Sequence, residues 1–151
     1  MTELERLLAI EEIKALKARY FRGVDSKDAA VLRAVFCDGA TTDFRSEAPT
    51  ALLHDPDAFT RGTLDTLEGM VTMHQGFMPE IEILSPTEAA ARWPMSDRIW
   101  ARDGVPARLP FKAFEGWGVY HDTYRRTAAG WCIASTRLER TKVIIDPPAG
   151  S

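Results

Sequence analysis

The stretch Lys17-Ala-Arg-Tyr20-Phe21-Arg-Gly-Val-Asp25 is the part of this chain around which the rest is organised. It closes residues 3–24, where apolar residues recur at three- and four-residue steps, the spacing that predicts an amphipathic helix. Residues three to four apart share a helix face, so Phe21 and Asp25 are expected on one surface with Tyr20 beside them. A second stretch, Thr72-Met-His74-Gln-Gly-Phe77, carries a histidine. We expect Asp25 and His74 to meet in one pocket as an acid–base pair.

Length and composition indicate one globular domain. The 151 residues, 45% hydrophobic and 27% charged, are ordinary for a soluble protein with a real core. A net charge of −3 gives no reason to expect nucleic acid or a membrane as partner. No apolar run approaches a membrane span, and the N-terminus lacks the layout of a signal peptide. Cys37 and Cys132 have no metal-type spacing, so a cytoplasmic protein with free thiols is expected.

The first half of the chain predicts two further helices. A short one follows Ser26-Lys-Asp28 and ends at Asp38-Gly39, after which residues 40–44 are β-prone. Residues 45–55 have little periodicity and are expected to form a loop. The third helix begins at Asp55-Pro56, because proline is favoured at the first helical position, and is predicted to run to about Thr72.

The second half of the chain predicts strands. They cover residues 80–84, 88–101, 111–126 and 131–145, with a hairpin connection at 127–130. Three helices followed by a four-stranded antiparallel meander make an α+β domain over 1–146, with a short tail at 147–151. A long twisted sheet curls, and helices against its concave face leave a cone with a pocket at its open end.

Three stretches resemble the SnoaL-like family of the nuclear transport factor 2-like superfamily. They are the helix end Tyr20 to Asp28, the segment Phe36 to Phe44, and the hairpin Gly116 to Trp131. The resemblance implies a cystatin-like α+β cone, with three N-terminal helices packed on a curved antiparallel sheet. Within the family the chain resembles the scytalone dehydratase and hexachlorocyclohexane dehydrochlorinase type. In those enzymes a histidine after the third helix is the base and an aspartate after the first helix orients it.

The resemblance implies these roles for His74 and Asp25. An imidazole titrates near working pH, which suits a general base, and a carboxylate on its other nitrogen fixes the tautomer. Tyr20 can donate a hydrogen bond to an oxygen that gains charge. Each residue also has a structural interpretation: His74 as a surface histidine, Asp25 as a helix cap and Tyr20 as half-buried core. Scytalone dehydratase has a second histidine where this chain has residues 93–97 without one, which argues against scytalone as substrate.

Strand alternation separates an inner from an outer face in the second half. It places Gly118 and Tyr120 toward the pocket and His121 toward solvent or a subunit partner. Which of residues 135–137 faces inward stays open. Ketosteroid isomerase, on the same fold, has its base on the first strand, where this chain has Asp43-Phe44; our alignment puts Phe44 at that position and disfavours an isomerase of that type.

The sequence therefore predicts a cofactor-independent lyase or dehydratase-like enzyme for a small apolar or aromatic molecule. The catalytic residues are Asp25, His74 and Tyr20, and the predicted pocket-lining residues are Phe21, Val24, Phe44, Trp93, Met95 and Tyr120. No metal or cofactor is expected, because ligand spacing and nucleotide loops are missing. The alternatives on the same fold are a non-catalytic small-molecule-binding protein, a polyketide cyclase or isomerase, and a domain that only oligomerises. An apolar outer face further predicts a homo-oligomer, a trimer or a dimer.

Overall fold

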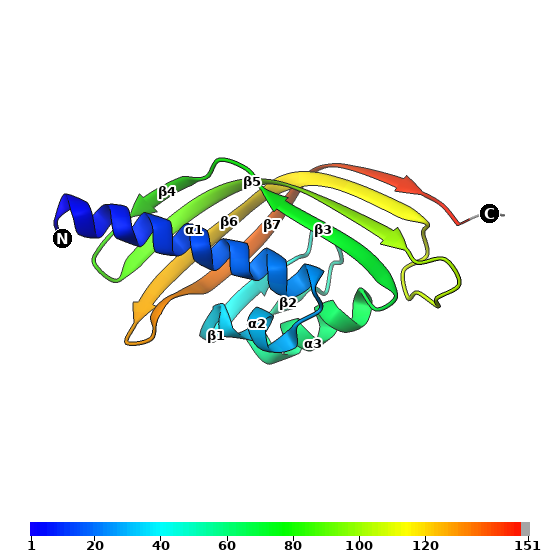
Figure 1. The fold of residues 1–151 in the computed structure, drawn as a ribbon, viewed down its shortest axis with the longest axis horizontal. Helices are drawn as coiled ribbons and strands as arrows, with labels where there is room; N and C mark the ends of the chain where they lie inside the picture. The colour runs from blue at the N-terminus through cyan, green and yellow to red at the C-terminus, as the bar shows by residue number, and fades with distance from the viewer. Residues whose placement is uncertain (149–151) are drawn as a thin grey trace.

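The computed structural model describes residues 1–148, which form an α+β cone (Figure 1). The helices are α1 (Glu3–Asp25), α2 (Ala29–Ala34) and α3 (Pro56–Thr66). The strands are β1 (Phe36–Asp43), β2 (Leu52–Leu53), β3 (Met70–Gly76), β4 (Glu80–Ile83), β5 (Glu88–Ala101), β6 (Ala113–Thr127) and β7 (Gly130–Asp146). The tail predicted at 147–151 falls largely outside the described residues.

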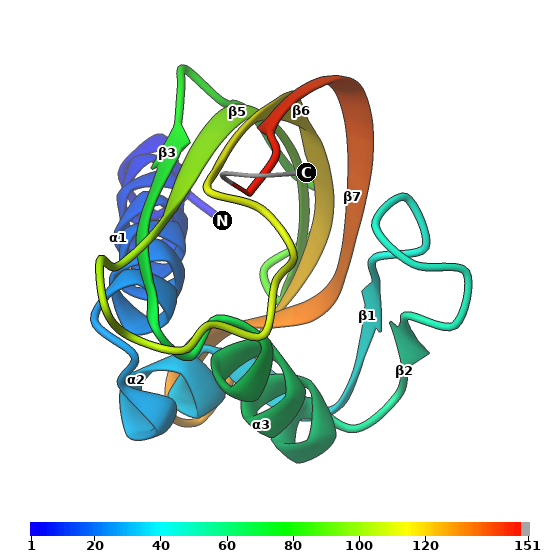
Figure 2. The ribbon, with the colours of Figure 1, turned by 90° about the vertical axis from the view of Figure 1, so that its right-hand side faces the viewer.

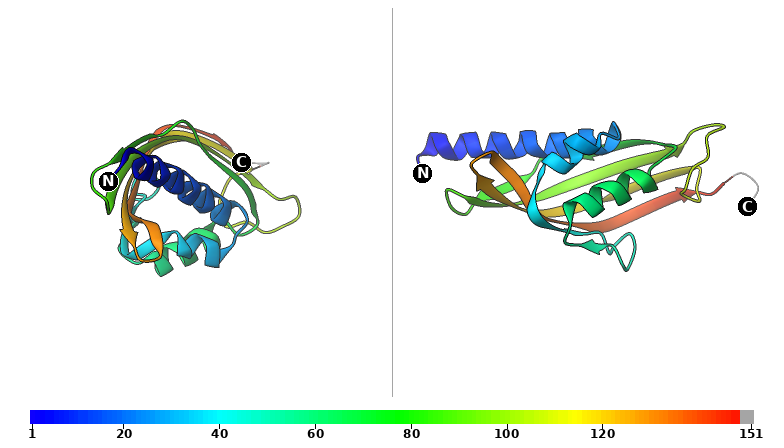
Figure 3. Two further views of the ribbon diagram at one scale, coloured as in Figure 1. Left: turned by 60° about the vertical axis from the view of Figure 1, so that its left-hand side comes forward. Right: turned by 90° about the horizontal axis from the view of Figure 1, so that it is seen from below.

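One curved sheet forms the wall of the cone. Its strand order is β2-β1-β7-β6-β5-β3, with β4 paired to β5. The meander β5-β6-β7 is antiparallel as predicted, but β1 runs parallel to β7, so the sheet is mixed and not purely antiparallel. Figure 2 shows the sheet curling around a central space, with α1 beside β3 on one side and β1 on the other. In the left view of Figure 3 the long strands arch over α1.

Two predicted boundaries are wrong for a tertiary reason. Strand β1 already begins at Phe36, where a helix was expected, because Phe36 pairs with Ile133 of β7 and the Ile133 amide donates to the Val35 carbonyl at 2.8 Å. Helix α3 ends at Thr66, not near residue 72. Gly69, with φ of 77°, then turns the chain into β3. His74 therefore lies within a strand paired with β5, and not directly after the last turn of a helix.

Helix α1 begins and packs as its sequence predicts. Thr2 and Glu5 form a capping box, in which the Glu5 amide donates to Thr2 Oγ1 at 3.2 Å and the Thr2 amide donates to Glu5 Oε2 at 2.7 Å. One face is buried against the sheet, through Ala9, Ile13, Leu16, Tyr20 and Val24. The last residue of the helix is Asp25, so the fold delivers this carboxylate to the helix end.

A fully buried ion pair joins α1 to the sheet. Lys17 Nζ donates to Asp122 Oδ2 of β6 at 2.7 Å, and both side chains are 0% exposed. Asp122 also accepts from Thr136 Oγ1 at 2.6 Å and from the Tyr124 hydroxyl at 2.8 Å. The ammonium lies 3.7 Å from the Tyr120 ring centroid, a cation–π contact. Burial lowers the pKa of Lys17, and the neighbouring Asp122 carboxylate opposes that shift.

The two cysteines form a disulfide, which corrects the expectation of free thiols. Cys37 lies on β1 and Cys132 on β7, 95 residues apart in sequence. The parallel pairing of β1 with β7 brings them together, and this pairing has no local sequence signal. Within residues 1–148, no helix is both long enough and apolar enough to cross a bilayer.

Candidate functional site

A cavity of about 650 Å³ lies between the helices and the concave face of the sheet. Its wall is mainly aromatic and aliphatic, including Phe44, Phe59, Phe111, Phe114, Ile99, Leu109 and Leu138. The acidic and basic side chains in this wall are Glu47, His74, Asp97 and Arg140, and its hydroxyl groups come from Tyr20, Thr63, Thr66 and Tyr120. An apolar cavity with a few convergent polar groups is the usual form of a small-molecule site.

Asp25 and His74 are in contact at the edge of this cavity. His74 Nδ1 lies 2.7 Å from Asp25 Oδ1. Asp25 Oδ2 accepts from the His74 amide at 2.9 Å, and Asp25 Oδ1 also accepts from Thr72 Oγ1 at 2.9 Å. Because an ionised carboxylate only accepts hydrogen bonds, the Nδ1 atom carries the proton in this contact. Nε2 lies on the side of the ring away from Asp25.

Neighbouring side chains hold the His74 ring in place. Phe21 lies nearly parallel to the imidazole, with ring centroids 6.4 Å apart and an interplanar angle of 13°. Lys27 Nζ donates to Thr72 Oγ1 at 2.8 Å, which orients that hydroxyl toward Asp25. Burial lowers the pKa of Lys27, while Asp25 opposes the shift. The His74 side chain is 9% exposed, so its orientation is set by these contacts and not by solvent.

A second carboxylate faces the other nitrogen of His74. Asp97 Oδ2, from β5, lies 3.7 Å from His74 Nε2. The same carboxylate binds the Arg140 guanidinium in a two-pronged pair, at 2.8 and 2.7 Å. Arg140 Nε donates to Glu47 Oε1 at 2.5 Å. Burial disfavours the Arg140 charge, but the hydrogen bonds to Asp97 and Glu47 raise its pKa overall.

Arg140, Glu47 and Asp97 are not among the site residues predicted from the sequence. A signal for this pair was present in Gly116. A Cβ at that position would collide with the Arg140 guanidinium and the Asp97 carboxylate. A glycine in a strand interior often marks such a close approach. The room that Gly116 leaves is therefore taken by an ion pair and not by open cavity.

Two tyrosines complete the wall near α1. Tyr20 and Tyr120 both line the cavity, with ring centroids 5.9 Å apart and an edge-on arrangement. They are 2% and 1% exposed. Burial raises the pKa of both phenols, so both hydroxyls stay protonated at neutral pH and can act as hydrogen-bond donors.

Three of the six predicted lining residues lie behind the wall. Val24, Phe44 and Tyr120 line the cavity, whereas Phe21, Trp93 and Met95 do not. Trp93 and Met95 lie at buried positions of β5, but both are covered by neighbouring side chains. Trp93 Nε1 donates to the Tyr124 hydroxyl at 2.9 Å, in the network that ties α1 to the sheet. Met95 Sδ lies 3.6 Å from Arg140 Nη1.

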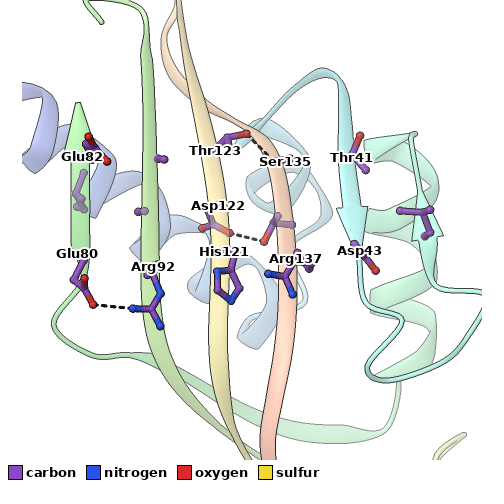
Figure 4. Close-up of a pocket in the computed structure, with 15 residues that line it drawn as sticks. Thr41, Asp43, Glu80, Glu82, Arg92, His121, Asp122, Thr123, Ser135 and Arg137 are labelled. Carbon is purple, nitrogen blue, oxygen red and sulfur yellow. Dashed lines mark hydrogen bonds and ion pairs between the residues drawn. The ribbon is translucent and has the colours of Figure 1, made fainter. Parts of the chain in front are cut away.

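His121 points to the outer face of the sheet, away from the cavity. There it lies in a second hollow of about 770 Å³ that crosses β4, β5, β6, β7 and β1 (Figure 4). Arg92, His121 and Arg137 occupy directly paired positions on three neighbouring strands. His121 Nε2 contacts Glu139 Oε2 at 2.9 Å. On β7, Ser135 and Arg137 share this outer hollow, while the Thr136 hydroxyl turns inward to Asp122.

His54 and Asp43, to which no catalytic role was assigned, have partners on the surface. His54 Nδ1 lies 3.3 Å from Thr41 Oγ1. Asp43 pairs with Arg45 at 2.7 Å, and the hydrogen bonds from Arg45 lower its pKa to about 2. Asp43 faces the outer hollow and not the cavity. In the part of the chain that the structure describes, no group of three or more His, Cys, Asp and Glu side chains could hold a metal ion.

Comparisons with known proteins agree with this architecture. The sequence model of the SnoaL-like domain matches residues 5–137. A type 2 hexachlorocyclohexane dehydrochlorinase, LinA, is 19% identical with a TM-score of 0.80, over 99% of this chain and 95% of that one. A candidate scytalone dehydratase from Novosphingobium aromaticivorans is 19% identical with a TM-score of 0.80, over 99% of both chains. A type 3 LinA dehydrochlorinase from Novosphingobium barchaimii is 16% identical with a TM-score of 0.77, over 99% and 97%. At these identities the likeness establishes the fold alone.

Proposed function

This chain belongs to the SnoaL-like family, and we propose that it is a cofactor-independent lyase of the dehydratase or dehydrochlorinase type. Its substrate is a small, largely apolar or aromatic molecule that fits a cavity of about 650 Å³. The observation that carries this proposal is the 2.7 Å contact between Asp25 Oδ1 and His74 Nδ1 at the edge of that cavity. LinA, which has the same fold, is a hexachlorocyclohexane dehydrochlorinase, an enzyme of this reaction type.

In the proposed reaction His74 is the base. Nε2 takes a proton from a substrate carbon, and the electron pair of the broken C–H bond forms the new double bond. A leaving group on the adjacent carbon departs with its own bonding pair. The imidazolium that forms lies between the carboxylates of Asp25 and Asp97, and opposite charges at this distance stabilise it. Tyr20, a protonated buried phenol, donates to the oxygen that gains charge.

One observation favours a second candidate, a non-catalytic binding protein. Asp25 accepts from the His74 amide and the Thr72 hydroxyl, two bonds that fasten β3 to the end of α1 without any chemistry. Under this alternative the cavity binds a ligand and His74 is a wall residue. The two candidates differ in whether a variant of His74 loses turnover or only affinity.

An elimination assay separates the two candidates. The probes are small aromatic ketones with a hydroxyl or chlorine on the β-carbon, because loss of water or HCl creates a conjugated product with a new ultraviolet absorbance. We expect turnover by the wild-type protein and a loss of about 10²–10⁴-fold in His74→Ala. His121→Ala is the matched control, because it removes a histidine from the opposite face of the same sheet. Probes that bind but are not converted would support the binding protein instead.

A further inference from the structure

The cavity holds one permanently charged cation among its described lining residues, Arg140. This guanidinium is shared by two carboxylates that differ in their surroundings. The Asp97 side chain is 3% exposed and binds Arg140 through both oxygens. The Glu47 side chain is 35% exposed and binds through one oxygen, to Nε. Asp97 is thus a fixed buried partner, and Glu47 is a partner at the boundary with water.

The charge balance of this triad explains why Glu47 is the weaker partner. Asp97 alone neutralises Arg140, so Glu47 adds an extra negative charge in a partly buried place. An ion pair that is partly exposed to solvent is generally worth little. If a ligand carboxylate took its position, the charge in the cavity would be unchanged and Glu47 would regain its hydration. The exchange would therefore cost little electrostatic free energy.

The chain around Glu47 permits this exchange. Glu47 lies in the segment between β1 and β2, together with the cavity-lining residues Ala48 and Ala51. The segment is held by main-chain bonds of its own, such as the Phe44 amide to the Ala51 carbonyl at 2.7 Å. It is also held by Ser46 Oγ, which donates to the Leu138 carbonyl at 2.9 Å. None of these bonds uses the Glu47 carboxylate, so its side chain can turn to solvent while the segment stays in place.

We propose that Glu47 occupies an anion-binding position on Arg140, and that the cavity takes apolar ligands carrying one acidic group, a carboxylate or sulfonate, which replaces Glu47. The inference rests on the proposed function in so far as the same cavity binds the substrate. It adds the substrate class and the orientation. Asp97 Oδ2 lies 2.7 Å from Arg140 Nη2 and 3.7 Å from His74 Nε2, so one oxygen adjoins both the cation and the base. A ligand anchored by its acid at Arg140 places its next carbons beside His74.

A pair of matched dyes tests the inference. The probes are 8-anilinonaphthalene-1-sulfonate, an anion, and N-phenyl-1-naphthylamine, which has the same aromatic skeleton without the sulfonate. Glu47→Gln removes the competing carboxylate, and we expect it to tighten binding of the sulfonate dye by about 3–10-fold. Binding of the neutral dye should stay within about twofold. Near-ultraviolet circular dichroism confirms native packing, because the sulfonate dye also binds loosely packed states.

Two further variants test whether a change in dye binding comes from the contact between Glu47 and Arg140. Glu139→Gln makes the same charge change on the outer face, where Glu139 contacts His121, and should alter neither dye. Arg140→Met combined with Asp97→Asn removes the cation without leaving a buried charged carboxylate, and should abolish the gain from Glu47→Gln. Equal effects of Glu47→Gln and Glu139→Gln, or of Glu47→Gln on both dyes, would overturn the inference and leave the proposed function standing. If neither dye binds the wild-type protein, the cavity does not take apolar ligands. That result would contradict both this inference and the proposed function.

Discussion

Replacing Lys17 with methionine tests whether the buried ion pair holds α1 on the sheet. Methionine keeps most of the side-chain length and removes the ammonium. Asp122 would then remain charged and buried, with hydrogen bonds only from Thr136 at 2.6 Å and Tyr124 at 2.8 Å. The Lys17 bond at 2.7 Å, its only countercharge in this network, would be lost. The substitution thus leaves the Asp122 side chain, which is 0% exposed, without a countercharge.

The structure sets the size of the expected effect. Removing one partner of a buried ion pair costs about 3–5 kcal/mol. For a domain of about 150 residues, each kcal/mol lowers the melting temperature by about 2–4 °C, so a fall of about 6–20 °C is expected. Adding Asp122→Asn to Lys17→Met removes the stranded charge and should recover part of the loss. Lys14→Met is the control on the same helix: Lys14 pairs with exposed Glu11, and its loss should cost less than about 1 kcal/mol.

Urea denaturation followed by circular dichroism measures these free energies of unfolding. The double variant is decisive, because two independent losses would add, whereas a stranded charge predicts that the double variant is more stable than Lys17→Met alone. Lys17→Met costing no more than Lys14→Met, or strictly additive losses, would refute the account of this ion pair.

Three further predictions concern the rest of the molecule. Reducing the disulfide, whose cysteines are 95 residues apart, should lower the free energy of unfolding by about 2–5 kcal/mol in urea titrations; an unchanged midpoint would mean that the bond is absent in solution. The pKa of Asp43 is lowered to about 2, so its stabilising pair with Arg45 is fully present above about pH 4 and lost as pH falls toward 2. Asp43→Asn should therefore flatten the acid dependence of the denaturation midpoint in that window, and identical curves would contradict this. The outer face carries exposed apolar residues, including Val71, Met73 and Trp100, and such a patch normally marks an interface. Light scattering should therefore give the mass of a trimer or dimer of the 16.9 kDa chain, and the mass of a single chain would refute this interface.

Much of the fold was predictable because it rests on local patterns. The three- and four-residue spacing of α1 predicted the buried positions of Tyr20 and Val24, and Asp25 ends that helix. Alternation along β6 separated inward Tyr120 from outward His121. These patterns are informative because one face of each helix or strand is buried, so its apolar residues recur at a regular spacing in the sequence.

The features that sequence reasoning missed are long-range. The parallel pairing of β1 with β7 joins distant segments, and the disulfide Cys37–Cys132 follows from it. Alternation along β7 does put Arg140 on the inner face, two residues after Leu138 and four after Thr136. Arg140 was missed because the sequence alone left open which of residues 135–137 faces inward, so the alternation had no starting point. Glu47 lies in a segment without periodicity, and only the folded structure brings it to Arg140. Trp93 likewise lies outside the cavity wall, because its indole N–H donates to Tyr124, which belongs with Asp122 and Lys17 to a buried hydrogen-bond network.

The most direct test of the proposed dyad is hydrogen–deuterium exchange at a substrate carbon. Bicyclic aromatic ketones in deuterated water are incubated with the protein, and loss of the α-proton signal is followed by NMR. This measures proton removal alone and needs no leaving group. If His74 is the base, the wild-type protein and His121→Ala should accelerate exchange, His74→Ala should lose about 10²–10⁴-fold, and Asp25→Asn should be slowed as well. Exchange that is equally fast in His74→Ala would contradict the assignment of His74 as the base.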